Sequence, residues 1–218
     1  MKRVASKATT KEVAGMFDSI AGKYDFLNHF FSLGIDKLWR RKLVKRLAKT
    51  KPAAVLDVAT GTGDQAIAIV KAGIPSVIGV DISEQMLAEG RKKVSAKNLS
   101  DKITLTYGNS EELQFADSSF DAVSVTFGVR NFEHLEKGLS EIYRVLRPGG
   151  QLFVLEFSMP KNPIVRCLYR FYFFRVMPFI GRLVSKDKKA YTYLPQSVDP
   201  FPKRESFLKT LQTLGFVN

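Results

Sequence analysis

The order of apolar and polar positions divides the chain into a helical beginning, a middle of alternating strands and helices, and an aromatic, basic end. Apolar residues recur at three- and four-residue steps over 13–33 and again over 35–47, which predicts two amphipathic helices. Between 53 and 158, short apolar runs alternate with helical patterns, as is typical of a parallel sheet with helices on both faces. Strands are predicted at 53–58, 77–81, 103–107, 120–126 and 151–157, and helices at 64–72, 84–97 and 133–146.

A glycine-rich turn follows the first predicted strand and begins the helix behind it. The strand ends in Val55-Leu56-Asp57-Val58, and the turn is Ala59-Thr60-Gly61-Thr62-Gly63. Glycine permits a sharp turn and lets a ligand approach the backbone closely, while the helix N-terminus offers unpaired N–H groups. Asp81 ends the second strand, where a carboxylate can accept hydrogen bonds from a ribose diol. The pattern predicts a nucleoside cofactor held by the first two strands.

The chain just beyond this turn contains two residues, Asp64 and Ala66, that narrow the choice of cofactor. Ala66 stands where the dinucleotide fingerprint has its third glycine, and Asp64 places a negative charge where a pyrophosphate would bind. Both argue against NAD and FAD. A cofactor without phosphate and with a cationic amino acid end, such as S-adenosylmethionine, fits better.

The other predicted strands also end in polar or small residues. Because ligands of open parallel sheets bind at the carboxyl ends of the strands, we expect these ends to line one crevice. They are Thr60-Gly61-Thr62, Asp81, Asn109-Ser110, Thr126-Phe127-Gly128 and Glu156.

Composition is ordinary for a soluble domain, with 45% hydrophobic and 25% charged residues among 218. Cys167 is the single cysteine, so no intrachain disulfide is possible, which suits a reducing cytosol. The N-terminus has no apolar core of signal-peptide length. The most apolar later stretch, 168–180, is interrupted by Arg170, Arg175 and Pro178 and is not expected to span a bilayer.

The net charge of +13 is concentrated in two segments. Residues 37–51 contain eight basic side chains and no acid, and residues 161–189 contain eight basic side chains and one acid, Asp187. Local basicity usually faces an anionic partner, so phospholipid and nucleic acid are both candidates, with a merely solvated surface as the alternative.

The fold class that these observations predict is α/β, a Rossmann-like sheet that is mostly parallel, with helices on both faces. We expect one domain over 1–218. Its parts are an N-terminal helical cap (1–50), a cofactor-binding core (53–158), an aromatic and basic helical cover (159–200) and a C-terminal helix (201–218). The cover is expected to turn its apolar side to the substrate and its basic side to a charged surface.

Several runs resemble the ubiquinone/menaquinone biosynthesis C-methyltransferases, a family of class I S-adenosylmethionine-dependent enzymes. Tyr24-Asp25-Phe26-Leu27-Asn28, with Ser32 and Trp39, is similar to the family's first signature, and Arg144–Gly150 with Glu156-Phe157-Ser158 is similar to its second. Phe127-Gly128-Val129-Arg130-Asn131 and Tyr191-Thr192-Tyr193-Leu194 fit as well. Asp36 departs from the first signature, which usually has histidine there. The family normally adds two strands beyond residue 216, so either the sheet is trimmed at this edge or the sequence is truncated there.

The resemblance implies S-adenosylmethionine as cofactor and no metal. We expect Asp81 to take the ribose hydroxyls and Asn109 with Ser110 to meet the adenine, while Gly61 and Gly63 admit the methionine moiety. Thr62 would add its hydroxyl or backbone N–H. The predicted cofactor-binding set is Asp57, Gly61, Thr62, Gly63, Asp81, Asn109, Ser110 and Thr126.

The reaction implied is methyl transfer to a ring carbon of a prenylated quinol, most simply demethylmenaquinol, with a benzoquinol precursor of ubiquinone as the alternative. Loss of a quinol proton makes the ring carbon nucleophilic. Arg130 is the candidate for stabilising the phenolate or holding an activating water, and Asn131 for orienting the hydroxyl. Tyr24 and Asp25 are expected to close over the cofactor, and His29 is a weaker candidate base.

A prenyl tail does not leave a bilayer readily, so the enzyme is expected in the cytoplasm, peripherally bound to the inner face of an anionic membrane. A homodimer or a complex of quinone-biosynthesis proteins is a further possible partner. RNA methylation is the competing function, but no Asn/Asp-Pro-Pro-Tyr run follows the fourth strand and Cys167 lacks a Pro-Cys context. A third alternative is a non-catalytic lipid-binding module. The intact Gly61-Thr62-Gly63 turn and Asp81 argue against it, because such a module would not need a cofactor site.

Overall fold

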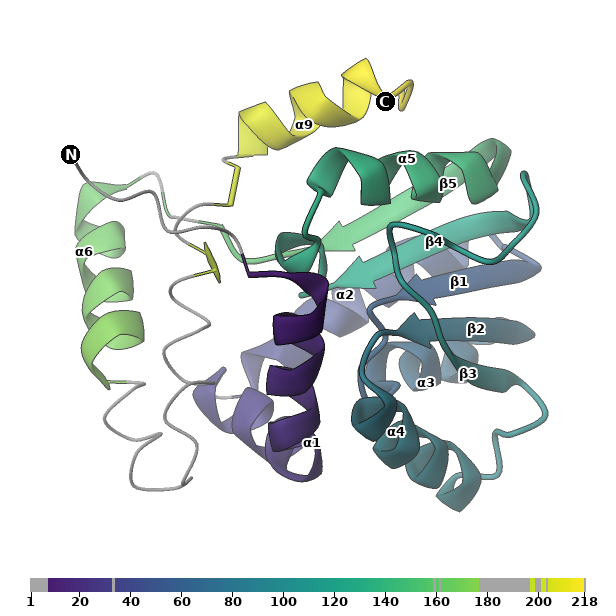
Figure 1. Cartoon of the computed structure of the whole chain (residues 1–218), viewed down its shortest axis with the longest axis horizontal. Coiled ribbons are helices and arrows are strands. Elements are labelled where there is room, and N and C mark those ends of the chain that lie inside the picture. The colour runs from purple at the N-terminus through teal and green to yellow at the C-terminus, as the bar shows by residue number, and fades with distance from the viewer. Residues whose placement is uncertain are drawn as a thin grey trace.

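Five parallel strands form one sheet in the part of the chain that the computed structural model describes, in the order β3-β2-β1-β4-β5 (Figure 1). The description covers residues 8–32, 34–158, 160, 162–176, 197–198, 201–202 and 204–217. The strands are β1 (Ala54–Val58), β2 (Ser76–Asp81), β3 (Ile103–Tyr107), β4 (Phe120–Thr126) and β5 (Leu146–Leu155). The predicted fold class is confirmed, and the chain order reverses between β1 and β4, where such sheets bind ligands.

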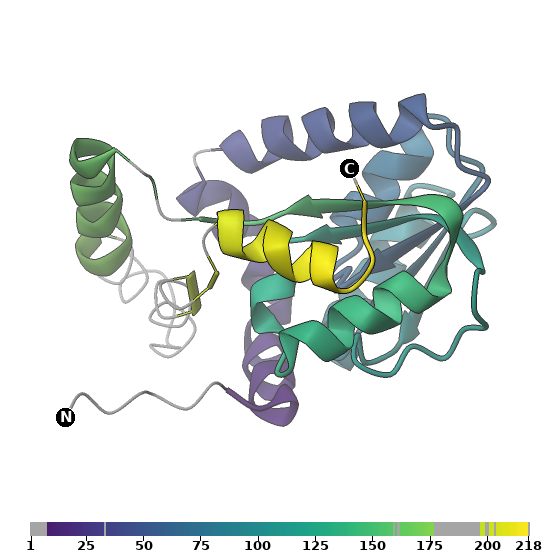
Figure 2. The ribbon, with the colours of Figure 1, turned by 90° about the horizontal axis from the view of Figure 1, so that it is seen from above.

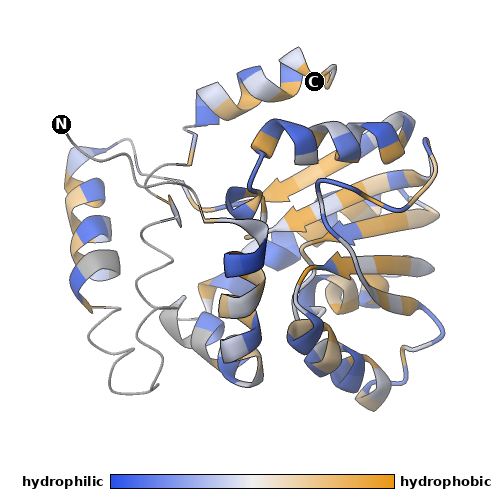
Figure 3. Cartoon of the chain, viewed as in Figure 1, coloured by the Kyte–Doolittle hydropathy of each residue, from blue (hydrophilic) through white to orange (hydrophobic). Residues whose placement is uncertain are grey.

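The central strands read as unbroken apolar runs because helices bury both faces of the sheet. The helices α2 (Ile35–Lys49), α3 (Asp64–Lys71) and α4 (Glu84–Ala96) pack with one core cluster, and α5 (Leu135–Val145) and α9 (Arg204–Thr213) pack with the other. Figure 2 shows α2 and α5 on opposite sides of the strands. In Figure 3 the strands are accordingly mostly hydrophobic, whereas the helices are mixed.

Helix α1 (Thr10–Phe31) crosses the carboxyl ends of the strands. Its first residue, Thr10, donates from its backbone N and its Oγ1 to Glu133, at 2.7 and 2.8 Å. Further along, Asp18 accepts a hydrogen bond from Ser83 Oγ at 2.6 Å. The helix is thus tied to the loops that follow two different strands, which makes it a cover over the predicted crevice.

Element boundaries differ from the predictions where distant groups intervene. The first helix begins three residues earlier than predicted because Glu133 supplies acceptors to its N-terminus from far along the chain. Strand β5 begins at Leu146, five residues before the predicted start, and Leu146 pairs with Phe120. Arg147-Pro148-Gly149-Gly150 was expected to separate helix from strand; it forms an irregular bulge within the strand, with Gly149 at φ +79°.

The predicted aromatic and basic cover is described only in part, as helix α6 (Pro163–Phe171) and the π-helical turn η2 (Tyr172–Val176). Most of 177–200, including Tyr191–Leu194, lies outside the described residues. No residue of α6 is buried, and several of its large apolar side chains are exposed. That the cover turns its apolar side to the substrate stays a prediction. Within the described residues, no helix combines the length and the apolarity needed to cross a membrane.

Candidate active site

A cavity lies at the carboxyl ends of β1, β2, β3 and β4, under α1. Six of the predicted site residues line it: Gly61, Asp81, Asn109, Ser110, Thr126 and Asn131. Val13, Phe17 and Tyr24 of α1 form the opposite wall. Burial raises the pKa of Tyr24, so its hydroxyl stays protonated at neutral pH and remains a hydrogen-bond donor. The geometry therefore assembles most of the predicted crevice, and the first signature contributes to it through Tyr24.

Asp81 is held at the cavity by two backbone donors. Its carboxylate accepts hydrogen bonds from Gly61 N at 2.8 Å and from Ser83 N at 2.9 Å. Burial raises the pKa of Asp81 to about 6, although these backbone N–H groups act in the opposite direction. A buried carboxylate with lone pairs left over is suited to accept the hydroxyls of a ribose.

Asp57 lies beneath the glycine-rich turn, and it does not line the cavity. Its carboxylate accepts hydrogen bonds from Thr60 Oγ1 at 2.6 Å and from Ser124 Oγ. Burial raises the pKa of Asp57 to about 6 as well. The next residue but one, Ala59, adopts a left-handed φ of +54°, a conformation that costs free energy in a non-glycine residue. The structure thus supports Asp57 as a residue that fixes the turn from below.

The last residue of β4, Thr126, lines the cavity and carries a buried hydroxyl. The hydroxyl of Thr126 is buried, and no group among the described residues hydrogen-bonds to it. Phe127, which follows, has a left-handed φ of +59°, and a Cβ on Gly128 would lie 2.4 Å from the Cβ of Ala59. Unsatisfied buried polar groups and strained turns occur preferentially at ligand and active sites. The residues present therefore fit a nucleoside cofactor with further polar groups.

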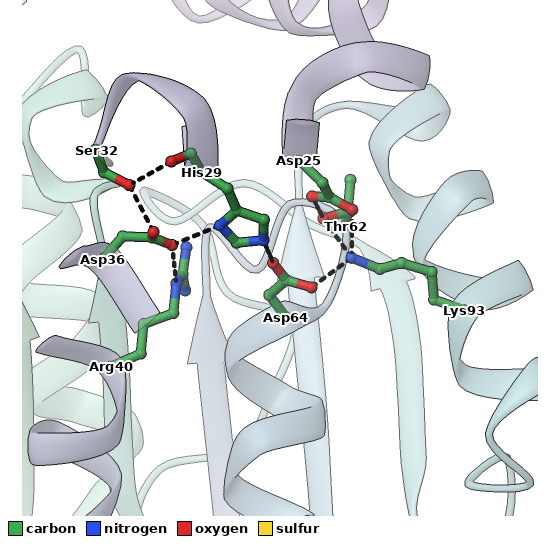
Figure 4. A network of polar contacts seen from close by, with 8 residues as sticks. All are labelled: Asp25, His29, Ser32, Asp36, Arg40, Thr62, Asp64 and Lys93. Carbon is green, nitrogen blue, oxygen red and sulfur yellow. Dashed lines mark hydrogen bonds and ion pairs between the residues drawn. The ribbon is translucent and has the colours of Figure 1, made fainter. Parts of the chain in front are cut away.

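Thr62 and Gly63 belong to the turn but do not line the cavity. Thr62 Oγ1 donates to Asp25 at 2.5 Å and accepts from Lys93 Nζ at 2.9 Å, so its hydroxyl serves to attach α1 (Figure 4). Gly63 precedes α3 with φ +77°, a conformation that glycine adopts without strain. Any contact of Thr62 with a cofactor would have to come from its backbone.

The contacts of Thr62 are part of a larger polar network that joins α1, α2, α3 and α4 (Figure 4). Lys93 Nζ lies 2.6 Å from Asp25 and 2.5 Å from Asp64. His29 lies between two carboxylates, with Nδ1 2.9 Å from Asp36 and Nε2 3.6 Å from Asp64. Asp64 is therefore already engaged by the Lys93 ammonium, with the His29 ring nearby, and it does not line the cavity, so the geometry does not support it as the partner of a cofactor ammonium. His29 likewise serves to connect helices.

Asp36, the departure from the first signature, is fully buried in this network. It accepts a hydrogen bond from Ser32 Oγ at 2.6 Å and lies 3.7 Å from Arg40 Nε. With His29, these residues give the buried carboxylate three polar partners. A buried charge requires such compensation.

Arg130 is buried and does not line the cavity. Its guanidinium Nη1 donates to Glu156 Oε1 and to the Phe127 carbonyl, both at 2.6 Å. Its Nε donates to Ser197 Oγ at 3.2 Å. These bonds hold the turn that carries Asn131, so the structure places Arg130 behind the site and Asn131 in its wall.

Sequence reasoning did not single out Met86, Phe132 and Glu133, which also line the cavity. Met86 lies in the first turn of α4, directly after the loop that follows Asp81, and this position in the chain is a signal that could have identified it. Nothing local identifies Glu133, because its role depends on contact with a helix more than 100 residues away. Lys93 lacks any motif and is recognisable only from its contacts.

The fold is shared with solved S-adenosylmethionine-dependent methyltransferases. A Thermotoga maritima protein described as a methyltransferase, possible histamine N-methyltransferase, matches with a TM-score of 0.63 at 22% identity, over 94% of this chain and 81% of that one. The [4+2]-cyclase SpnF matches with a TM-score of 0.72 at 18% identity, over 96% of this chain and 73% of that one. The chain therefore has the fold of the class I S-adenosylmethionine-dependent methyltransferases.

The chain belongs to the ubiE/COQ5 methyltransferase family, whose model matches residues 4–218. A Bacteroides fragilis protein named demethylmenaquinone methyltransferase is 47% identical over 95% of this chain and 85% of its own length. A Geotalea daltonii protein named ubiquinone/menaquinone biosynthesis C-methyltransferase UbiE is 44% identical over 95% and 89%. The predicted family, enzyme class and cofactor are confirmed.

Proposed function

We propose that the protein transfers a methyl group from S-adenosylmethionine to a ring carbon of demethylmenaquinol in the biosynthesis of menaquinone. Relatives from Bacteroides fragilis, Porphyromonas gingivalis and Chlorobaculum parvum, at 43 to 47% identity, carry the name demethylmenaquinone methyltransferase. The observation that carries the proposal is a cavity that combines Asp81 with the unsatisfied Thr126 hydroxyl and with Asn131.

The cofactor is proposed to bind along the ends of β1, β2 and β3. Asp81 would accept the ribose hydroxyls, and Asn109 with Ser110 would meet the edge of the adenine. Ile82 and Met86 provide apolar surface for a planar base. The Gly61 turn leaves room for the methionine moiety, with Asp57 holding the turn from below.

When bound, S-adenosylmethionine supplies an electrophilic methyl group, so this chain's own residues must align and activate the quinol. Asn131 is proposed to hold the hydroxyl whose proton is lost, which makes the neighbouring ring carbon nucleophilic. The Tyr24 hydroxyl is a second donor in the same cavity. Phe17, Phe127 and Phe132 exclude water from it.

The role of Arg130 in stabilising the phenolate or holding an activating water stays a prediction. Its contacts with Glu156 and with the Phe127 carbonyl support a second role, in which it holds Asn131 in place. A buried guanidinium with a buried carboxylate partner is suited to fixing a turn, because removing either partner would leave the other charge uncompensated.

A test uses purified protein, methyl-labelled S-adenosylmethionine, short-chain demethylmenaquinol and total RNA in one mixture. Label extracted with the quinol supports the proposal, and label in acid-precipitated RNA refutes it. Asn131→Ala should lower turnover by about 100-fold, the scale of losing one transition-state donor, while cofactor affinity is kept. Gln212→Ala, which removes an exposed amide on α9, is the matched control and should be silent. Full turnover in Asn131→Ala would remove Asn131 from the mechanism.

We further propose that the enzyme works at the surface of an anionic membrane, in the cytoplasm. The exposed basic side chains of α2 support this, because each Lys or Arg near an anionic surface contributes roughly 1 kcal/mol to binding. They include Lys37, Arg41, Lys42, Lys45, Arg46 and Lys49.

A further inference from the structure

Helix α6 leaves large apolar side chains in water along one face. Ile164, Leu168 and Phe171 recur at four- and three-residue steps, which places them on the same side of the helix. Their exposed fractions are 71%, 65% and 63%, and that of Val165, beside them, is 50%. Soluble proteins rarely leave a continuous apolar face of this kind exposed unless it meets a partner or a membrane.

One side of α6 is turned inward, because Tyr169 is half-buried while every other residue of the helix is exposed. Burial raises the pKa of Tyr169 to about 12, and the charges of Arg130 and Glu156 both act on its hydroxyl. Tyr169 lies one residue after Leu168, on another side of the helix. Tyr169 therefore faces the rest of the molecule, whereas Ile164, Leu168 and Phe171 lie on other sides of the helix. Val165, four residues before Tyr169, lies at the edge of the apolar face.

A second segment exposes apolar side chains on the same side of the molecule. Phe26 in α1 and Ile35 and Leu38 in α2 are 61%, 41% and 57% exposed. Figures 1 and 2 both show the turn between α1 and α2 on the side of the core that faces α6. Two segments separated by more than 120 residues thus leave apolar groups in water at one side.

The charges around α6 decide which partner fits this surface. No Asp or Glu occurs between Glu156 and Asp187, whereas Arg166, Arg170 and Arg175 lie in or directly after α6. An apolar face accompanied only by cations is complementary to an anionic lipid surface, where the apolar groups reach the acyl region and the cations meet the head groups. A second copy of this chain would bring the same cations together and repel.

We propose that α6 inserts its apolar face, Ile164, Val165, Leu168 and Phe171, into the surface of an anionic bilayer and so holds the active site at the membrane. This rests on the proposed function, since it explains how a prenylated quinol reaches the site. The inference goes beyond the proposed function in two respects. It names α6 as the element that enters the lipid, and it requires insertion of apolar side chains as well as attraction between charges.

The single cysteine of the chain, Cys167, reports on this helix directly. It is exposed and lies within α6, next to Leu168. A nitrobenzoxadiazole label on Cys167 should shift its emission to the blue on vesicles of phosphatidylcholine with phosphatidylglycerol, and the shift should persist in part at high salt, because insertion is not screened. Binding without any shift would overturn the proposal, since another face would then be docked.

Leu168→Glu tests the energetics, with Leu208→Glu, an exposed leucine on α9, as the matched control. Leu168 and Leu208 are 65% and 40% exposed, so both variants should stay folded, and their thermal midpoints check this. Leu168→Glu should weaken the partition of the unlabelled protein to these vesicles by about tenfold or more, the scale of losing one buried leucine side chain. Equal binding of the two variants would refute insertion. So would concentration-dependent self-association, in the absence of lipid, that Leu168→Glu abolishes.

Activity separates this inference from the proposed function. Short-chain demethylmenaquinol, which needs no bilayer, tests methyl transfer in the wild-type protein and in Leu208→Glu. If it is methylated while the Cys167 label never shifts, the function stands and the insertion fails. If the label shifts but no quinol is methylated, the proposed substrate is wrong and the membrane helix stands. For Leu168→Glu, turnover of long-chain quinol in vesicles should fall relative to short-chain quinol.

Discussion

Replacing Lys93 by methionine should loosen the helix that covers the cofactor site. Lys93 Nζ contacts Asp25 at 2.6 Å, Asp64 at 2.5 Å and Thr62 Oγ1 at 2.9 Å, and so connects α4 to α1 and to the glycine-rich turn. Methionine keeps most of the side-chain volume but removes the charge. Asp25 and Asp64 would then be left close to each other without the cation that joins them.

The magnitude follows from how far these groups are buried. The side chains of Lys93, Asp25 and Asp64 are 25%, 33% and 27% exposed, between the surface and the core. Hydrogen bonds to charged groups contribute roughly 1.5–3 kcal/mol when buried, and exposed ion pairs contribute about 0–1 kcal/mol. We therefore expect a loss of about 2 kcal/mol in the free energy of unfolding. For a chain of this size that corresponds to a fall of roughly 4–8 °C in the Tm.

The same change should weaken cofactor binding, because α1 supplies one wall of the cavity. If the full 2 kcal/mol acts on the closed arrangement, the Kd for S-adenosylmethionine rises by up to about 30-fold. Calorimetric titration measures the Kd, and differential scanning calorimetry measures the Tm. Lys92→Met is the matched control, since Lys92 is 72% exposed and pairs with Glu89 across a solvated helix surface.

A double-mutant cycle with Asp25→Asn isolates the contact itself. If Lys93 acts through Asp25, the two changes should be non-additive by at least about 0.5 kcal/mol in unfolding free energy. The reasoning is refuted if Lys93→Met is as silent as Lys92→Met in both Tm and Kd. It is also refuted if the cycle shows full additivity, because the network would then not connect α1 to the turn.

Two further predictions concern the cofactor site. Burial raises the pKa of Asp81 to about 6. As the pH falls, the folded protein therefore binds a proton at Asp81 at a higher pH than the unfolded chain does. The free-energy cost of burying this carboxylate is relieved as the pH falls through 6. Affinity for S-adenosylmethionine should be constant from pH 8 to 7 and should fall below about pH 6, where the Asp81 carboxylate is protonated and no longer accepts two hydrogen bonds. If the affinity of Asp81→Asn depends on pH in the same way, Asp81 is not the group responsible. A Cβ on Gly90 would lie 3.0 Å from the carbonyl carbon of Thr62, so Gly90→Ala should destabilise the fold by about 1–3 kcal/mol in urea unfolding and weaken cofactor binding. Gly15→Ala, where nothing lies within 4 Å, should instead be neutral or stabilising, and equal effects would contradict the packing argument.

The order and type of the core elements were predictable because they depend on local periodicity. The predicted third and fourth strands match β3 and β4 residue for residue, and Ser83 accepts a hydrogen bond from Met86 N at the start of α4 as its type and position suggested. Parallel strands bring their carboxyl ends to one edge, so Asp81, Asn109 and Ser110 were predicted together and lie together.

The errors arose where a residue's role depends on groups far along the chain. Thr62 was expected to offer the cofactor its hydroxyl or its backbone N–H; Asp25 and Lys93 occupy the hydroxyl, which leaves the backbone N–H. The bulge in β5 and the early start of α1 also depend on partners more than 20 residues away. The exposure of the apolar face of α6 could not be predicted either, because periodicity shows that a helix has an apolar side and not what covers it.

The sequence by itself thus determined the sheet, its cofactor edge and the family, because alternation, glycine turns and strand-end carboxylates are local features. Only the tertiary structure decided which polar groups remain available to a ligand. Thr126 is left with an unsatisfied hydroxyl, whereas Asp64, Thr62 and Arg130 are engaged by partners from other elements. Hydrogen-bond partners are assigned by packing across the whole chain, and a buried polar group is available to a ligand only where packing has provided no partner for it.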